Sequence, residues 1–331
     1  MESWDETTNC CSWDGVECDK ESGHVIGLDL SCSWLYGTIH PNSSLFSLPH
    51  LQSLNLAFNF FNYFPISSAF SRFTGLTHLN LSDSGLSGKI SSKISLLSKL
   101  TSLDLSWNYN LRLKNPGFQL LVQNLTKLRE LHLDNVNISS VIPSSMLNLT
   151  SLSSLHLAHC GLQGKFHDDI FHLPNLKELR LAGNSNLTGH LPKLNSSSPL
   201  EYLSLGSTSF SGELPNSIGN LKSLNRLYVY NCKFSGSIPA SLEKLKNLTS
   251  LSLSNNNFEG STLDVFPNLR NLAYLSLGGN NFSDPLLLLL ANLTQLVLLS
   301  VSSTQVAGPL PSQTSVITNS RAILTNSSPI H

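Results

Sequence analysis

A short apolar–polar–apolar pattern, leucine–x–leucine, recurs along most of the chain. It reads LNLAFN at Leu54 and LRLAGN at Leu179, with valine in place of the second leucine in some copies. Twelve copies begin at Leu28, Leu54, Leu79, Leu103, Leu131, Leu155, Leu179, Leu203, Leu227, Leu251, Leu275 and Leu299. From Leu131 onward the copies are 24 residues apart. Such a period is much longer than the periods of about 3.6 and about 2 residues within a helix or strand, so it indicates a repeated structural unit. Alternation directs the leucines inward and the residue between them outward, which predicts one short strand per unit.

The residues after each predicted strand also repeat. The position five residues after the first leucine is often asparagine, as at Asn59, Asn108, Asn184, Asn256 and Asn280. An inward asparagine can hydrogen-bond the backbone of its own turn. A pattern of the form L-x-G-x-I-P follows, for example FSGSIP at Phe234, in which glycine allows a sharp turn and proline stiffens the outer edge. Because one unit cannot bury its leucines alone, neighbouring units must stack into a continuous core.

The predicted fold is an α/β leucine-rich-repeat solenoid of about twelve repeats of 24 residues. We expect a curved parallel β-sheet on its concave face, and loops with short 3-10 or α turns on its convex side. Residues 1–24 would form a partial N-terminal cysteine cap, residues 25–311 the repeats, and residues 312–331 an irregular tail. Between Leu105 and Leu133 the spacing lengthens to 28, and the extra residues predict a longer, helical convex segment.

Charge and composition narrow the possible partners. The net charge is −1 and only 12% of residues are charged, so no nucleic-acid partner is expected. Sequons of the form Asn-x-Ser/Thr are numerous and favour a secreted, glycosylated surface, although an Asn- and Ser-rich repeat also produces some by chance. We expect glycans at Asn42, Asn124, Asn137, Asn148, Asn186, Asn195, Asn247, Asn281 and Asn292. Asn80 is an exception, because a glycan on this predicted strand would obstruct the concave face.

Three of the six cysteines lie in NCCSWDGVECD, which begins at Asn9. Closely spaced cysteines at the end of a solenoid favour a disulfide staple, which persists in oxidising compartments. A zinc site is the alternative, but the nearby sequence offers only His24 as a further ligand, so we expect no metal and no cofactor. Cys160 and Cys232 occupy asparagine positions three repeats apart, which predicts buried free thiols.

The same region resembles a known family. The run C-C-S-W-D-G-V-x-C-D, followed by G-x-V-I-x-L-D-L and NSSLFSL, is similar to the N-terminal region of plant extracellular leucine-rich-repeat receptor-like proteins, in particular tomato Cf-type disease-resistance proteins. The resemblance implies a Cys11–Cys18 disulfide and leaves the partners of Cys10 and Cys32 open. It also implies a location at the extracellular face of the plasma membrane or in the apoplast.

The two ends of the chain differ from that family. No basic and apolar leader follows Met1, so the sequence predicts no signal peptide. The apolar stretch Leu286–Val301 is shorter than the roughly 20 residues of a spanning helix, and its leucines fit the last repeat better. We therefore expect an incomplete receptor, and leave open whether it is a fragment, a truncated product or a partial gene model.

Large polar and aromatic side chains concentrate on the predicted concave face of the central repeats. Interfaces favour such residues as anchors. The candidate ligand-binding residues are Trp107, His132, His156, His159, Arg180, Tyr202, Arg226, Tyr228, Tyr230 and Tyr274. The histidines could make binding pH-dependent, hold a metal, or be ordinary exposed side chains, and we expect no metal. No catalytic motif such as G-x-S-x-G or H-E-x-x-H occurs, so we do not expect an enzyme.

The function implied by the resemblance is recognition of a peptide or protein ligand by a receptor ectodomain, in plant defence signalling with partner receptor kinases. One alternative is a secreted inhibitor similar to polygalacturonase-inhibiting proteins. Those proteins end in a cysteine-bearing cap, whereas no cysteine follows Cys232 here. A non-functional receptor fragment is the other alternative.

Overall fold

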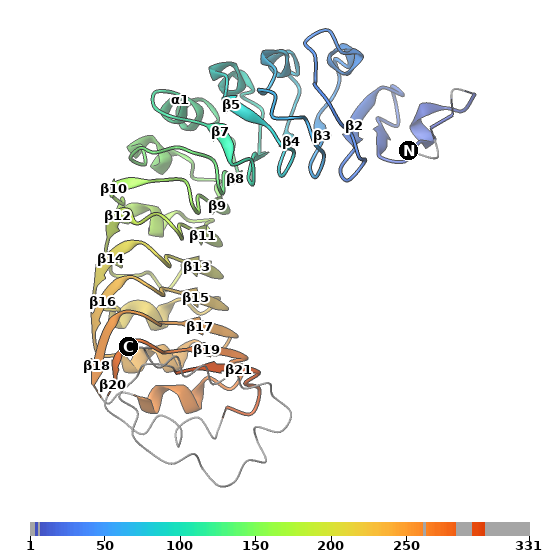
Figure 1. Cartoon of the computed structure of the whole chain (residues 1–331). Coiled ribbons are helices and arrows are strands. Elements are labelled where there is room, and N and C mark those ends of the chain that lie inside the picture. The colour runs from blue at the N-terminus through green and yellow to red at the C-terminus, as the bar shows by residue number, and fades with distance from the viewer. Residues whose placement is uncertain (1–3, 6, 261–262, 283–292, 302–331) are drawn as a thin grey trace, which may run out of the picture. The chain divides into compact units, whose positions relative to one another are not determined.

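Short parallel strands, one for each leucine–x–leucine copy, build the main sheet of the protein. The computed structural model describes residues 4–5, 7–260, 263–282 and 293–301. The chain divides into two compact units, Met1–Leu162 and Gln163–His331, and within each unit the strands follow one another in sequence order (Figure 1). The N-terminal unit contains β1 (Val16–Cys18), β2 (Val25–Asp29), β3 (Ser53–Asn55), β4 (His78–Asn80), β6 (Ser102–Asp104), β8 (Glu130–His132) and β9 (Ser154–His156). The C-terminal unit contains β11 (Glu178–Arg180), β13 (Tyr202–Ser204), β15 (Arg226–Tyr228), β17 (Ser250–Ser252), β19 (Tyr274–Ser276) and β21 (Leu298–Ser300).

The register of these strands aligns the leucines into one row in each unit. In the N-terminal unit Leu54 pairs with Leu79, and Leu79 with Leu103. In the C-terminal unit Leu203 pairs with Leu227 in the same way. All five side chains are at most 1% exposed, because each lies under the leucine of the next repeat. The fold predicted from the leucine period is confirmed.

The asparagine positions form a buried ladder beside the sheet. Asn108 donates through Nδ2 to the backbone oxygen of Leu81 in the preceding repeat (2.8 Å) and to that of Leu105 in its own (3.1 Å). Cys160 takes over this role, because its thiol donates to the oxygens of Leu133 (3.0 Å) and Ala158 (3.4 Å). The ladder thus satisfies backbone groups that would otherwise be buried without a partner.

A second set of parallel strands, which the sequence pattern did not predict, follows the ladder. The L-x-G-x-I-P segments are strands rather than plain turns. They are β5 (Ser87–Lys89) and β7 (Asn110–Arg112) in the N-terminal unit, and β10 (Gln163–Lys165), β12 (Asn186–Gly189), β14 (Ser209–Gly212), β16 (Lys233–Gly236), β18 (Asn257–Gly260) and β20 (Asn281–Phe282) in the C-terminal unit. Most of these strands contain a glycine, and a proline often follows, so their sequences indicate turns rather than strands.

Short helical turns return the chain to the next strand. Nine are 3-10 turns within the described residues: η1 (Cys10–Ser12), η2 (Ser44–Ser47), η3 (Ser68–Arg72), η4 (Ser92–Leu96), η5 (Ser144–Asn148), η6 (Asp168–His172), η7 (Asn216–Asn220), η8 (Ala240–Lys244) and η9 (Leu263–Asn268). The longer repeat contains α1 (Gly117–Asn124) instead, which confirms the helical segment predicted there. Phe118, Leu121 and Val122 of α1 are buried against the core.

The N-terminal end differs from the repeats. Strand β1 pairs with β2 in the antiparallel sense, so the cap extends the main sheet as a hairpin rather than as a further repeat. The tail 312–331, the sequon Asn292, and part of Leu286–Val301 lie outside the described residues. The predictions made for them stay predictions.

Candidate ligand-binding surface

In the C-terminal unit, the outward face of the main sheet carries a cluster of tyrosine and arginine side chains. Tyr202, on β13, is the centre of this cluster. The guanidinium carbon of Arg180 lies 4.5 Å from the centroid of the Tyr202 ring, and that of Arg226 lies 5.7 Å from it. Tyr228 packs edge-on against Tyr202, with 5.6 Å between ring centroids. Parallel pairing in register brings these residues together, because Tyr202 is opposite Arg226 on the neighbouring strand.

The cluster extends along the sheet. Tyr274 lies edge-on to Tyr228 at a centroid distance of 6.5 Å. The Tyr228 hydroxyl donates to Ser250 Oγ at 2.8 Å, which fixes the orientation of its ring. All three tyrosines and Tyr230 are half-buried, whereas Arg226 is exposed. The face therefore presents ordered aromatic edges with one accessible guanidinium, the composition that interfaces favour.

Charge within this cluster is partly balanced. Arg180 donates to Glu178 Oε2 at 3.1 Å. Burial raises the pKa of Tyr202, and the nearby Arg180 and Arg226 only partly oppose that effect. Burial also raises the pKa of Tyr230. These tyrosines therefore remain neutral hydrogen-bonding groups at physiological pH.

The N-terminal unit carries a different cluster at its last strands. The rings of His132 and His156 are stacked, with centroids 3.9 Å apart and planes 8° from parallel. The hydroxyl of Ser154 lies between their Nε2 atoms, at 2.9 and 3.0 Å. His132 Nδ1 lies 3.6 Å from Asp104 Oδ2. Burial alone would raise the pKa of Asp104, but hydrogen bonds from His132 and Ser106 outweigh it, and the pKa lies below its usual range.

Not all of the predicted histidines are available to a ligand. His156 is only 8% exposed, so its ring belongs mainly to the packed sheet. Strand alternation places His156 on the surface, but the stacked His132 ring covers most of it. Its predicted role in ligand binding stays a prediction. His159 is exposed and has left-handed backbone geometry (φ 56°), a position beyond the strand itself.

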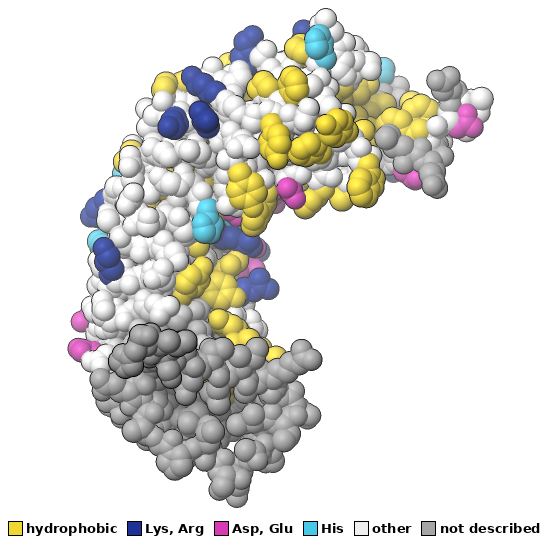
Figure 2. Space-filling model, viewed as in Figure 1, with side chains coloured by type: hydrophobic (Ala, Val, Ile, Leu, Met, Phe, Trp, Pro, Cys, Tyr) yellow, Lys and Arg dark blue, Asp and Glu magenta, His cyan; other side chains and the backbone are white. Residues whose placement is uncertain are grey.

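Exposed aromatic side chains also follow the strands of the N-terminal unit. Trp107 is 50% exposed and packs edge-on against Tyr109, with 6.3 Å between centroids. Figure 2 shows apolar side chains gathered on the visible face of this unit. The further exposed members are Trp34, Tyr36, Phe58, Phe60, Tyr63 and Phe64. Of these exposed aromatic residues only Trp107 is among the predicted binding residues. The others lie in turns after the strands, where leucine–x–leucine alternation does not say which side chains are exposed.

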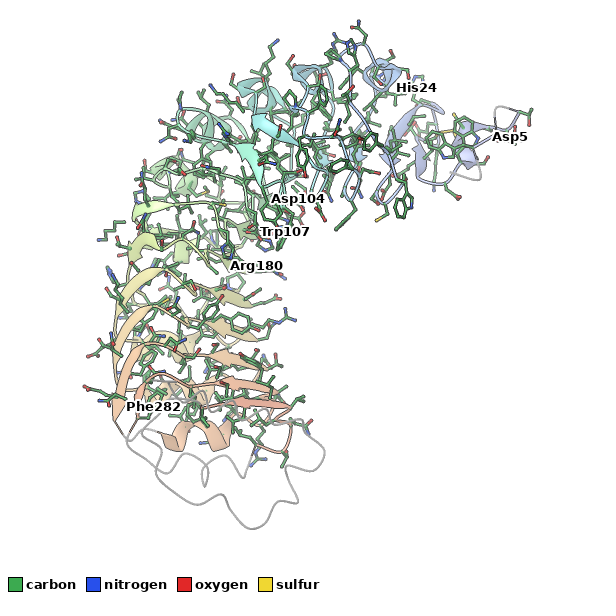
Figure 3. The ribbon with its side chains drawn as sticks, in the orientation of Figure 1. Asp5, His24, Asp104, Trp107, Arg180 and Phe282 are labelled. Atoms are coloured by element: carbon green, nitrogen blue, oxygen red, sulfur yellow. A yellow bond between two sulfur atoms is a disulfide. The ribbon has the colours of Figure 1, made fainter. Side chains whose placement is uncertain are left out.

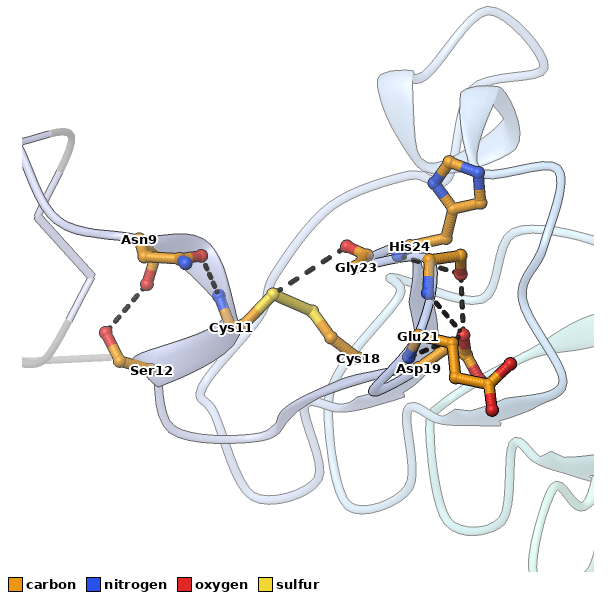
Figure 4. The surroundings of a disulfide bond; sticks show 9 residues. Asn9, Cys11, Ser12, Cys18, Asp19, Glu21, Gly23 and His24 are labelled. Carbon is orange, nitrogen blue, oxygen red and sulfur yellow. Dashed lines mark hydrogen bonds between the residues drawn. A yellow bond between two sulfur atoms is a disulfide. The ribbon is translucent and has the colours of Figure 1, made fainter.

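The cap cysteines form the staple. Cys11 and Cys18 are joined by a disulfide, the pair that the resemblance implies (Figure 4). Asn9 Oδ1 accepts from the backbone N–H of Cys11 at 3.0 Å and thereby caps the short turn η1. Among the described residues, the one group of three potential metal-ligating side chains is Cys10, Cys11 and Cys18. Two of these are in the disulfide, which leaves a single thiol and does not fit a zinc site.

The sequons lie mostly away from the candidate surface. Asn137, Asn186 and Asn281 are exposed on or beside the second set of strands, and Asn148 and Asn247 are exposed near the helical turns. Asn80 differs, because its Oδ1 accepts from Ser82 N (2.9 Å) and Ser82 Oγ (2.8 Å) on the strand face.

Comparison with known proteins agrees with this architecture. A family model described as leucine rich repeat N-terminal domain matches residues 1–19. Leucine rich repeat models match residues 126–187, 199–221, 223–245 and 247–269. The chain is a leucine-rich-repeat protein.

Individual relatives of this leucine-rich-repeat protein are plant receptor-like proteins. Receptor-like protein 6 of Arabidopsis thaliana is 44% identical over 231 residues, which are 68% of this chain and 23% of the relative. Receptor-like protein Cf-9 of Solanum pimpinellifolium is 44% identical over 224 residues, which are 67% of this chain and 26% of the relative. The resemblance to Cf-type receptor-like proteins is thus confirmed, and the chain spans only those fractions of these relatives.

A solved structure shows the same fold. The PEPR1–AtPEP1 crystal structure matches with a TM-score of 0.70 and 30% identity, over 89% of this chain and 45% of that chain. Among the described residues of the leucine-rich-repeat protein, no helix has both the length and the apolar character needed to cross a bilayer.

Proposed function

We propose that this leucine-rich-repeat protein is an extracellular ligand-recognition region that binds a peptide or protein through the outward face of its main sheet. The observation that carries the proposal is the cluster around Tyr202, which is flanked by Arg180 and Arg226 and continued by Tyr228. Tyrosine and arginine supply large contact areas and fixed hydrogen-bond directions, and such residues dominate binding energies at interfaces. Similarity to plant receptor-like proteins supports the same proposal.

A binding experiment tests the cluster directly. The glycosylated chain would be used to select peptides from a random phage-displayed library, and the affinity of the selected peptides would be measured. Tyr202→Ala, Arg226→Ala and Tyr228→Ala combined should weaken binding by about 100-fold or more, because anchors of this kind each contribute about 2 kcal/mol or more.

The matched control replaces exposed lysines elsewhere in the same unit. Lys233→Ala with Lys244→Ala, on β16 and η8, should leave binding unchanged. Equal binding by the triple variant and the original chain would move the ligand site away from the cluster. The triple variant must keep the circular dichroism spectrum of the original, since a change would indicate damage to the fold.

The biological setting is part of the proposal. Resemblance to Cf-type proteins favours defence signalling, in which a partner receptor kinase would transmit the binding event. Inhibition of a fungal polygalacturonase by nanomolar protein would instead favour the secreted-inhibitor alternative. Ligand-dependent co-precipitation of the chain with a receptor-kinase ectodomain, lost in the triple variant, is the result expected for a receptor.

A further inference from the structure

Just after β3, β4, β6, β8 and β9 of the N-terminal unit, one residue has left-handed backbone geometry. In three successive repeats these residues are Phe58 (φ 56°), Asp83 (φ 45°) and Trp107 (φ 62°). Backbone hydrogen bonds keep the three in register, since Phe58 N donates to Ser82 O at 3.0 Å and Asp83 N to Ser106 O at 2.9 Å. All three side chains are solvent-exposed, with Phe58 59% and Trp107 50% exposed. The edge of the sheet therefore presents an aromatic ring, a carboxylate and a second aromatic ring in sequence.

The neighbouring residues leave the carboxylate accessible between the rings. Two positions further along, the same repeats carry Phe60, Gly85 and Tyr109. Gly85 has no side chain that could cover Asp83. The Phe60 ring lies against Gly85, so closely that a Cβ at this position would come within 2.7 Å of Phe60 Cδ2. The repeats of Phe58 and Trp107 are two strand spacings apart, roughly 9–10 Å. A planar group in van der Waals contact at about 3.5–4 Å from each side fits in that space.

Charge complementarity indicates what this site would attract. The Asp83 carboxylate accepts no hydrogen bond and forms no ion pair among the described residues. The strands β1 to β9 of the main sheet in this unit carry Glu17, Asp29, Asp104 and Glu130, and none of them contains a lysine or arginine. Asp104 and Trp107 lie close together at the end of β6 (Figure 3). The surface around the two rings is thus acidic and lacks a cation of its own on these strands.

We propose that Phe58, Asp83 and Trp107 form a binding site for the guanidinium of an arginine side chain in an extended peptide ligand. Tryptophan is the strongest cation–π partner among the aromatic residues, and arginine is the cation that more often stacks on such faces. The flat guanidinium also matches a carboxylate in a two-point hydrogen bond, which an ammonium group cannot form. The site deepens the proposed function, on which it rests, by naming one chemical group of the ligand.

The test uses a defined arginine probe. The peptide acetyl-Gly-Arg-Gly-amide would be titrated into the chain while the indole N–H signal of Trp107 is followed by NMR, with the signal assigned through its absence in Trp107→Leu. The matched peptide contains citrulline, which has the same shape without the charge. We expect a saturable shift with the arginine peptide and little or none with citrulline.

Substitution of the carboxylate provides the second arm. Asparagine tolerates left-handed backbone geometry, so Asp83→Asn should keep the local fold. The substitution should lower the affinity for the arginine peptide about 2- to 5-fold, the range for one exposed ion pair. Asp169→Asn, an exposed carboxylate in the C-terminal unit, should have no effect. Equal binding of arginine and citrulline peptides, or an unchanged affinity in Asp83→Asn, would overturn the proposal. Equal binding of the corresponding lysine peptide would overturn the assignment to a guanidinium.

The two proposals can fail separately. If the triple variant of Tyr202, Arg226 and Tyr228 loses library peptides but still shows the Trp107 shift, both proposals hold. If the arginine probe never shifts Trp107 while library peptides bind through the tyrosine cluster, only the arginine site is wrong. If library peptides bind the triple variant normally while the arginine peptide shifts Trp107, the tyrosine cluster is wrong and the arginine site stands.

Discussion

A single buried asparagine connects two repeats. Asn108 donates to oxygens of its own turn and of the preceding repeat, while its Oδ1 accepts from Ser84 N at 3.2 Å and Leu86 N at 2.9 Å. The residue is 1% exposed, so no water can replace these partners. Removing an asparagine from the ladder therefore leaves donors and acceptors of two repeats unsatisfied.

Asn108→Ala should lower the free energy of unfolding by about 2–4 kcal/mol, because each buried polar group left without a partner costs about 1–3 kcal/mol. The exposed Asn110→Ala is the control and should change it by less than about 0.5 kcal/mol. Urea unfolding followed by circular dichroism measures both. An Asn108 variant as stable as the control would show that the ladder contributes nothing.

Asp104 should make the stability of the folded protein depend on pH. The pKa of Asp104 is lowered in the folded chain. The carboxylate therefore contributes to the free energy of unfolding at pH values above its unfolded pKa of about 3.9, and this contribution is lost as the pH falls through the folded pKa. Asp104→Asn should destabilise the protein at neutral pH by about 1–2 kcal/mol. The difference from the original chain should disappear in acid when urea midpoints are compared over a pH series. A difference independent of pH would exclude the charged hydrogen bonds as its cause.

At the scale of elements, the second set of strands in the C-terminal unit is held by a stack of phenylalanines. Phe234 and Phe258 have ring centroids 6.2 Å apart and planes 2° from parallel, and Phe258 stacks similarly on Phe282. All three are at most 1% exposed. Gly236 ends β16 with φ 75°, a conformation that favours glycine. The FSG part of the repeat thus specifies both a core side chain and the turn after it.

Phe234→Ala should lower the free energy of unfolding by about 3–5 kcal/mol, because it removes a fully buried ring and leaves a cavity within the stack. Phe234→Leu, which refills most of the space, should cost distinctly less. Thermal unfolding of the two variants gives the comparison. Equal losses would mean that ring stacking, rather than the filled volume, dominates the contribution.

At the scale of the molecule, the two units present different chemistry on equivalent positions. The strands of the N-terminal unit carry carboxylates and histidines, whereas those of the C-terminal unit carry Tyr202, Arg226 and Tyr228. The shared repeat makes this difference possible, because outward positions can change without altering the leucine core. Each unit therefore offers a ligand its own surface, acidic on the strands of the N-terminal unit and aromatic with arginines on those of the C-terminal unit.

Glycan placement over the whole molecule should keep the strand face bare. Expressed in plant cells, the chain should carry glycans at exposed sequons such as Asn137, Asn186 and Asn247, and none at Asn80. The Asn80 amide oxygen is engaged by Ser82, and the residue is half-buried on β4. Peptide mapping by mass spectrometry after deglycosylation in ¹⁸O water measures each occupancy. A fully occupied Asn80 would contradict a ligand surface on that part of the sheet.

The sequence predicted the parts of the fold that depend on the repeat itself. Leu203 and Leu227 repeat at a constant period, so their alignment in a parallel sheet follows from the need of each unit to bury its leucines. Cys160, at an asparagine position, was correctly expected to be buried. The antiparallel β1 and the second set of strands were not predicted. Strand β1 does not carry the leucine–x–leucine pattern, and most strands of the second set contain a glycine, which indicates a turn.

By itself, the sequence determined the repeat, the core and the columns of outward residues, because these depend only on spacing along the chain. The tertiary structure decided which outward side chains are available. It buries His156 beneath a stacking contact and exposes Trp107 at a left-handed position. It also surrounds Tyr202 with Arg180 and Arg226. These outcomes depend on how side chains from adjacent strands pack against one another, and contacts between repeats exist only once the repeats have stacked.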